Sequence, residues 1–404
     1  MVGIFVDKVT ESLHVLRVDD IKVKFFEALW EIPEGITYNA YLLHTSEGAI
    51  LFDSWKHVYT DEFIEALKTV VDLRDIAYII VHHMEQDHTG SLPRVLEENG
   101  FKAEVLCHML ATRMFSRFLG IKPKIHAVKD GEELKVGGKV LKFIYTPWLH
   151  WPETMMTFIP GDDVLLSCDA FGGYSIPKTL YDESDNVIAE YLPHVRKYVA
   201  TVIGHYINYI GKAVEKLDKL GIKPKIIAPA HGLIFRNKPE AIVDYYVKLA
   251  SGIAEKGKIV VVYSSMYGSV GKAISAVIDK LKEKGFSPVV YRFTDTERIN
   301  LSDFISDVMD CQALIIGAAT YENNVFPLIR HLLDVLVEKI KAGKPVLVVS
   351  SYGWGRIAGS KILKILTGAG FKVVDVVEFQ GMPDGDDLAK VRSGVDSLID
   401  QIAR

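Results

Sequence analysis

The chain has 404 residues, which predicts two or three domains, and its 49% hydrophobic content is enough for large cores. A formal net charge of −5 argues against a general nucleic-acid-binding protein, and no apolar run reaches the length of a membrane span. The first residues lack a basic segment followed by an apolar one, so we expect no signal peptide. Three separated cysteines without a Cys-x-x-Cys pair predict a reduced, cytoplasmic protein.

Short apolar strands interrupted by helical patterns characterise the first part of the chain. We expect strands at 41–43, 49–52, 78–81, 103–106, 141–145, 154–159, 164–167 and 225–228, and helices at 61–71, 189–209 and 211–220. Two series of strands and helices favour a layered α/β sandwich. A linker follows at 251–258, so we place the first domain at 1–252 and the second at 257–404.

The second domain has a more regular pattern. Near-continuous apolar strands are expected at 258–263, 289–293, 313–316, 346–350 and 373–379, and helices at 270–284, 302–309, 326–340, 357–367 and the end of the chain. Five such strands separated by helices predict a doubly wound, parallel, five-stranded sheet.

One loop, directly after the strand at 78–81, carries four potential metal ligands within six residues. Two imidazoles and two carboxylates suit a pair of first-row metal ions better than one. Three more candidates lie in later loops at strand ends. Each alone is compatible with a polar surface or a turn, but the density of the first four favours a metal site. The candidate ligands are His83, Glu85, Asp87, His88, His150, Asp169 and His231.

Their order resembles the metallo-β-lactamase fold, in which a His-x-[His/Glu]-x-Asp-His loop precedes a distant His, Asp and His. The resemblance covers the first domain and implies an αββα sandwich. Most hydrolases of that superfamily have His at the position of Glu85. An anionic oxygen ligand there moves the expectation from zinc towards iron and from water activation towards redox chemistry. Zinc also accepts Glu, so this is a tendency.

In the second domain, the first strand ends in a hydroxyl-rich turn that enters a helix, where backbone N–H groups face an anion. One such turn is also compatible with a plain connection. This turn resembles the flavodoxin phosphate loop, and two later strand ends resemble that family's isoalloxazine loops. The lack of Gly-x-Gly-x-x-Gly disfavours nicotinamide. The resemblance implies FMN contacts by Ser264, Met266, Tyr267, Gly268, Ser269, Val270, Ala319, Thr320, Tyr321, Asn323, Asn324, Ser351, Tyr352, Gly353, Trp354 and Gly355.

Together the two domains are similar to flavodiiron proteins (A-type flavoproteins) over essentially the whole chain. The resemblance implies one FMN and two iron ions per subunit, in the minimal class without a fused rubredoxin or flavin reductase. It implies that the iron nearer the flavin is held by His83, Glu85 and His150, the other by Asp87, His88 and His231, and that Asp169 bridges them.

Flavodiiron proteins reduce dioxygen to water or nitric oxide to nitrous oxide, so the resemblance implies an enzyme of oxygen or nitric oxide detoxification. Two ferrous ions and reduced flavin together supply the four electrons that dioxygen requires. The resemblance also implies rubredoxin or another low-potential donor, and a head-to-tail homodimer or dimer of dimers, without nucleic-acid or membrane partners. Two alternatives stay open: a metal-dependent hydrolase with an accessory flavodoxin-like domain, and a non-catalytic flavin electron carrier.

Overall fold

The computed structural model describes residues 3–403, which form two compact units. The first unit contains the described residues up to Tyr198 together with Tyr206–Ala250; the second contains Val199–His205 and the described residues from Ser251 onward. The domain limits 1–252 and 257–404 stay a prediction. Among the helices of residues 3–403, none has both the length and the apolar character needed to cross a bilayer.

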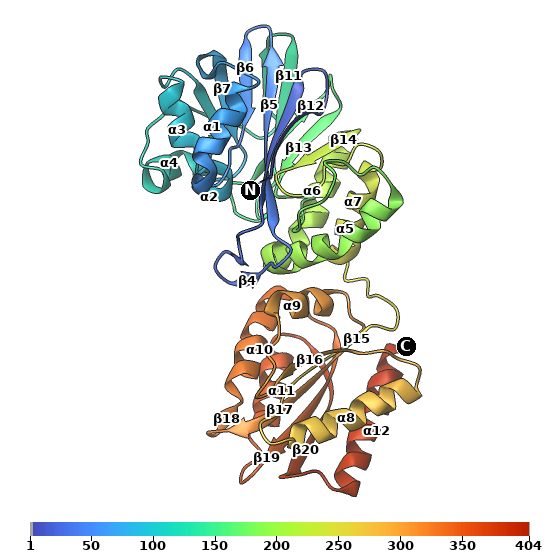
Figure 1. Ribbon diagram of the computed structural model, residues 1–404. Coiled ribbons are helices and arrows are strands. Elements are labelled where there is room, and N and C mark those ends of the chain that lie inside the picture. Colours follow the sequence, from blue (N-terminus) through green and yellow to red (C-terminus); the bar gives the residue numbers. More distant parts are fainter. Residues whose placement is uncertain (1–2, 404) are drawn as a thin grey trace. The chain divides into compact units, whose positions relative to one another are not determined.

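Two sheets form the centre of the first unit (Figure 1). The first sheet is antiparallel from β1 to β6 and parallel from β6 to β9. In spatial order its strands are β1 (Gly3–Lys8), β2 (Leu13–Asp20), β5 (Ile36–Thr45), β6 (Gly48–Phe52), β7 (Ile76–Val81), β8 (Glu104–His108) and β9 (Ile125–Val128). A separate short hairpin joins β3 (Phe25–Phe26) to β4 (Trp30–Glu31).

The second sheet is antiparallel except for its last pair, β13 and β14, which is parallel. Its strands, in spatial order, are β10 (Glu133–Val136), β11 (Lys139–Tyr145), β12 (Met155–Ile159), β13 (Val164–Cys168) and β14 (Ile226–Pro229). The apolar faces of the two sheets share one core: Val15, Phe52 and Leu106 of the first sheet belong to the same cluster as Phe143 and Leu166 of the second.

Helices cover both outer faces of this pair of sheets (Figure 1). The helix α1 illustrates why they pack there: Phe63, Ile64 and Leu67 recur at helical spacing and are buried, whereas the opposite face is charged. One side carries α1 (Thr60–Lys68), α2 (Gln86–Thr89), α3 (Leu92–Glu98) and α4 (Met114–Phe118), and the other α5 (Asp185–Tyr198), α6 (Asn208–Lys219) and α7 (Pro239–Ala250). The predicted αββα sandwich is therefore confirmed.

Several elements before residue 251 differ from the sequence prediction, and two of them show why. The helix expected at 189–209 ends at Tyr198, and a π-helical segment, Val199–Ile203, which belongs to the second unit, follows it. The apolar run continues through that segment, so periodicity alone does not show the change. The strand β2 was not predicted because charged residues interrupt its pattern; in the structure Arg17 is buried and its Nε lies 2.7 Å from the Asp19 carboxylate.

The second unit is a parallel sheet with helices on both faces (Figure 1). Its strands lie in the order β16 (Val289–Phe293), β15 (Ile259–Ser264), β17 (Ala313–Tyr321), β19 (Pro345–Tyr352) and β20 (Lys372–Gln380), with β18 (Asn324–Val325) added antiparallel to β17. The helices are α8 (Ser269–Glu283), α9 (Leu301–Met309), α10 (Pro327–Lys339), α11 (Ala358–Gly368) and α12 (Gly385–Ile402).

The order of these strands confirms the predicted doubly wound five-stranded sheet. On one face, Ile274 of α8 and Val395 of α12 pack in one cluster with Ile315 of β17. All five strands are parallel, but β16 lies on one side of β15 and the later strands β17, β19 and β20 lie on the other. Open α/β sheets bind ligands in the crevice at the point where the strand order reverses in this way, here between β15 and β17.

Candidate functional site

The seven predicted ligands come from four chain segments that converge in the first unit. His83 and Glu85 follow β7, and Asp87 and His88 lie on the one-turn helix α2 rather than in an extended loop. The turn is held in place because both the backbone N–H and the hydroxyl of Ser54 donate to the His88 carbonyl, at 2.6 and 2.9 Å. The other segments follow β11, β13 and β14 and carry His150, Asp169 and His231.

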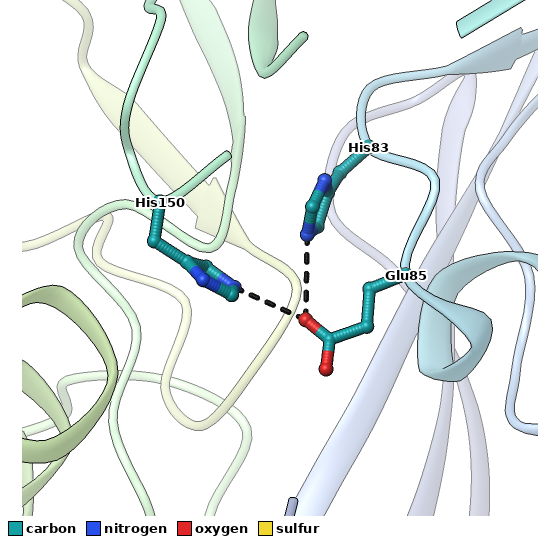
Figure 2. A group of neighbouring side chains, drawn as sticks. All are labelled: His83, Glu85 and His150. Atoms are coloured by element: carbon teal, nitrogen blue, oxygen red, sulfur yellow. Dashed lines mark hydrogen bonds and ion pairs between the residues drawn. The ribbon is translucent and has the colours of Figure 1, made fainter. Parts of the chain in front are cut away.

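Glu85 lies between two imidazoles. Figure 2 shows His83 and His150, from different loops, pointing at the same carboxylate. Nε2 of His150 is 3.1 Å and Nε2 of His83 is 3.4 Å from Glu85 Oε2. One ligand atom from each of the three residues lies within 4.8 Å of the others, which is close enough for all three to hold one ion.

A second group of the same kind consists of Asp87, His88 and His231. Asp169 lies between the two groups. Its Oδ1 is 3.1 Å from Nε2 of both His88 and His231, whereas its Oδ2 is 3.6 Å from Nε2 of both His83 and His150. The two oxygens of one carboxylate therefore face different ligand groups, which is the arrangement that a bridging ligand requires.

Several polar atoms at the centre of this cluster have no hydrogen bond within the described chain. They are both carboxylate oxygens of Asp87 and Oδ2 of Asp169, and both side chains are buried. Buried polar atoms are nearly always hydrogen-bonded, so three carboxylate oxygens without a hydrogen bond around a common point indicate missing partners. Two metal ions fit this donor set of imidazoles and carboxylates. Cys168 also lies within ligand distance of His88 and Asp169, but burial raises the pKa of its thiol.

Strong electrostatic coupling accompanies this packing. Burial disfavours the charged form of His88, but Asp87 and Asp169 outweigh it and raise its pKa to about 10. Burial also opposes ionisation of Glu85, yet hydrogen bonds with His150 and His83 hold its pKa below the usual value. Burial raises the pKa of Asp87. Strongly shifted pKa values among buried groups in contact are a feature of functional sites.

Three supporting groups were not predicted from the sequence. Glu153 Oε1 lies 2.8 Å from Nδ1 of His83, the backbone carbonyl of Thr37 lies 2.7 Å from Nδ1 of His231, and the Tyr198 hydroxyl donates to Asp169 at 2.9 Å. Because Nδ1 of His83 and of His231 is bonded in this way, Nε2 of each ring is directed at the cluster. Oδ1 of Asp169 is bonded to Tyr198, and its Oδ2 is likewise directed at the cluster. Partners of this kind fix ring orientation and tautomer in metal sites. Only Glu153, a carboxylate in the loop of His150, had a visible sequence signal.

Left-handed backbone also concentrates around the cluster. Trp148, Cys168 and Phe171 have φ values of 67°, 52° and 67°, and each lies within two residues of a candidate ligand. Such conformations are unfavourable for residues with a Cβ and persist where packing enforces them. Gly232, next to His231, has φ 77°, and a Cβ there would lie 1.6 Å from the Tyr191 hydroxyl oxygen. The site loops are therefore tightly constrained.

In the second unit, the turn after β15 has the features of an anion site. Gly268 adopts φ 88° immediately before α8. Within the described chain, the backbone N–H groups of Tyr267, Ser269 and Val270 have no protein acceptor, and the buried hydroxyl of Ser264 has no partner. Free amides at a helix N-terminus together with an unpaired hydroxyl fit a phosphate group.

The other two predicted flavin segments follow the neighbouring strands β17 and β19, so all three segments lie at the carboxyl edge of the sheet. Ala319, Thr320, Ser351 and Tyr352 belong to the strand ends rather than to loops. Trp354 is fully exposed. Aromatic surface beside an anion site fits a flavin, whose ring is flat and apolar.

Comparisons with known proteins agree with this description. The family model "ODP family beta lactamase" matches residues 36–232, and "Flavodoxin" matches residues 261–394. Nitric oxide reductase from Moorella thermoacetica is 30% identical over 95% of this chain and 95% of its own length. Rubredoxin-oxygen oxidoreductase from Megalodesulfovibrio gigas is 27% identical over 96% and 95%.

Solved structures show the same likeness. A variant of the flavo di-iron protein from Thermotoga maritima has a TM-score of 0.95 and 42% identity and covers 100% of both chains. Rubredoxin oxygen:oxidoreductase from Desulfovibrio gigas has a TM-score of 0.92 at 27% identity and covers 99% of each chain. The chain therefore belongs to the flavodiiron protein family. Its units have the expected metallo-β-lactamase-like and flavodoxin-like folds, and both sites have the donor groups that this family's diiron centre and FMN need.

Proposed function

We propose that this protein is an oxidoreductase that reduces dioxygen to water, nitric oxide to nitrous oxide, or both, with electrons from a reduced donor such as rubredoxin. The observation that carries the proposal is the placement of Asp169, with one carboxylate oxygen towards each ligand group. Relatives named nitric oxide reductase and rubredoxin-oxygen oxidoreductase support the reaction and the donor. The hydrolase alternative is not proposed, because Glu85 lies among the ligands and these relatives are reductases.

We assign the metal ligands as the sequence predicted: His83, Glu85 and His150 for one iron, Asp87, His88 and His231 for the other, and Asp169 as the bridge. When bound, the irons and the flavin supply the electrons for the reaction. The protein's part is to hold seven ligand side chains at fixed positions, so that two small gas molecules, or the two ends of one, would be bound side by side. Glu153 and the Thr37 carbonyl support this by fixing the rings of His83 and His231.

The FMN assignment rests on the three segments at the carboxyl edge of the second unit. We propose that Ser264 and the free amides of the turn before α8 bind the phosphate, and that the ends of β17 and β19 hold the isoalloxazine ring. All the FMN contacts predicted from the sequence are retained in this proposal. It further includes domains at 1–252 and 257–404, a head-to-tail dimer or dimer of dimers, and a cytoplasmic location.

Anaerobic stopped-flow reoxidation tests the reaction. Protein of measured iron and flavin content is reduced, then mixed with dioxygen or nitric oxide in parallel. We expect fast reoxidation of the flavin by at least one gas, without hydrogen peroxide, and the faster gas identifies the preferred substrate. His150→Ala should abolish the fast phase, whereas His126→Ala, at an exposed histidine distant in sequence from every ligand, should not. Reoxidation of the fully loaded protein at the rate of free FMN would refute the proposal.

A further inference from the structure

The hairpin between β17 and β18 has a turn that its own sequence does not favour. Tyr321 pairs with Asn324, so the turn consists of two residues, Glu322 and Asn323. Both have positive φ, 47° and 58°, as in a type I′ turn. Asn tolerates this conformation, but Glu does not favour it. The turn therefore depends on contacts from outside the hairpin.

Lys361 supplies those contacts from α11. Its ammonium donates to the backbone carbonyl of Asn323 at 3.0 Å and to the side-chain oxygen of Asn324 at 3.1 Å. The same Asn324 oxygen accepts from the backbone N–H of Val325 at 3.0 Å. One side chain thus fixes both the tip of the turn and the start of β18.

A second connection joins the same two elements. The Thr320 hydroxyl oxygen accepts from the backbone N–H groups of Ile357 and Ala358, at 3.3 and 3.0 Å. These are among the amides at the start of α11 that have no acceptor within the helix. The segment 351–355, at the end of β19, leads directly into this helix. Thr320 and Lys361 therefore connect the end of β17 to α11, the helix that follows β19 in the chain.

We propose that Lys361 is a positioning residue for the isoalloxazine ring of FMN. The inference rests on the proposed flavin site. By holding the turn at Glu322 and Asn323 against α11, Lys361 fixes the separation of the two strand ends that flank the ring. Binding is stronger when the groups around a ligand are ordered beforehand, because less conformational entropy is lost. Lys361 need not touch the flavin to have this effect.

Flavin binding to the full-length apoprotein tests this role. Lys361→Met removes the ammonium and keeps the stem, and we expect about fivefold weaker binding of both FMN and riboflavin, because the phosphate turn is untouched. Visible circular dichroism of the saturated variant should decrease, because the ring samples more orientations. Lys364→Met is the matched control: Lys364 is exposed on the same helix, and its ammonium forms no hydrogen bond or ion pair within residues 3–403. The control should bind both flavins within twofold of the wild type.

Two rescue variants separate positioning from a direct effect of charge. Lys361→Arg should restore most of the affinity, because the guanidinium can reach the same acceptors. Glu322→Asn in the Lys361→Met background should also restore it without any cation, because Asn stabilises the turn by itself. Equal affinity of Lys361→Met and Lys364→Met, or no rescue by Glu322→Asn, would overturn the inference. A wild-type apoprotein that binds neither flavin would overturn the flavin site itself and this role with it.

Discussion

The support of His83 by Glu153 leads to a prediction about one of the two proposed iron positions. Glu153 Oε1 lies 2.8 Å from Nδ1 of His83 and accepts from the backbone N–H of Met84 at 3.2 Å. Glu153 is 1% exposed, and although burial opposes it, the hydrogen bond with His83 lowers its pKa. The carboxylate therefore stays ionised and directs Nε2 of His83 towards Glu85. Glu153→Gln keeps the shape and removes the charge.

The expected loss follows from these contacts. A hydrogen bond to an ionised partner is about twice as strong as a neutral one, so replacing the carboxylate by an amide weakens the support of His83 by about 1.4 kcal/mol. That corresponds to roughly tenfold lower metal affinity, at the lower end of the 10–100-fold range for such partners. Most of the loss in affinity should fall on the ion assigned to His83, Glu85 and His150, because Glu153 is bonded to His83 and to none of the other six proposed ligands.

Iron occupancy of each position after anaerobic competition with a chelator measures this, with anomalous diffraction at the iron edge to distinguish the two positions. Glu132→Gln is the matched control, because Glu132 makes a similar contact of 2.7 Å with His126 on the surface. The control should retain both irons. Equal loss from both positions, or retention of both in Glu153→Gln, would refute the reasoning that one carboxylate orients one ligand.

Three further predictions concern other parts of the molecule. Glu85→His should raise the zinc-to-iron ratio of protein grown with both metals by about tenfold or more and suppress gas reduction, as metal analysis and turnover would show. Gly268→Ala and Gly285→Ala, at the two ends of α8 with φ 88° and 84°, should each destabilise the fold by about 1 kcal/mol, but calorimetry should find weaker FMN binding only for Gly268→Ala. Glu34 lies 2.7 Å from Lys197, and although burial opposes it, hydrogen bonds with His194 and Lys197 lower its pKa. This stabilisation is present above the unfolded-state pKa of about 4.3 and is lost as pH falls through the lower folded-state value. Glu34→Gln should therefore cost about 1 kcal/mol at pH 7 and progressively less in acid, as urea unfolding across pH would show.

The second unit was predictable because its strands are buried on both faces. Such strands are continuous apolar runs, as in Val260–Val262 at the centre of β15, and they stand out from the amphipathic helices between them. The first unit was less predictable. Its strand β2 buries the pair of Arg17 and Asp19, and charged residues in a strand are normally taken as exposed. The strand can be buried because Arg17 and Asp19 form an ion pair in the folded structure, and this pair is not visible in the sequence.

The metal site shows the same limit. The density of potential ligands after β7 predicted a metal site there, because four such side chains rarely follow a buried strand by chance, and the structure brings these residues into one cluster with the later candidates. The carbonyl of Thr37 could not be identified, since every residue has one and the contact with His231 joins positions 194 residues apart. Tyr198 likewise carries no sequence signal for its bond to Asp169. Residues that bind can be read from their chemistry, but residues that orient them depend on the fold.

The adjacent histidines at the end of β7 illustrate this most directly. Successive residues of an extended chain point to opposite sides, so His82 and His83 cannot both face the metal cluster. His82 is buried instead, with Nδ1 2.7 Å from Asp53 and Nε2 2.8 Å from Thr157. Both ring nitrogens are therefore used within the protein. Asp53 follows β6 of the first sheet and Thr157 lies on β12 of the second, so His82 ties the two sheets together directly beneath the loop of His83 and Glu85. His82 therefore links the two sheets, and the adjacent His83 is directed towards the cluster of proposed metal ligands.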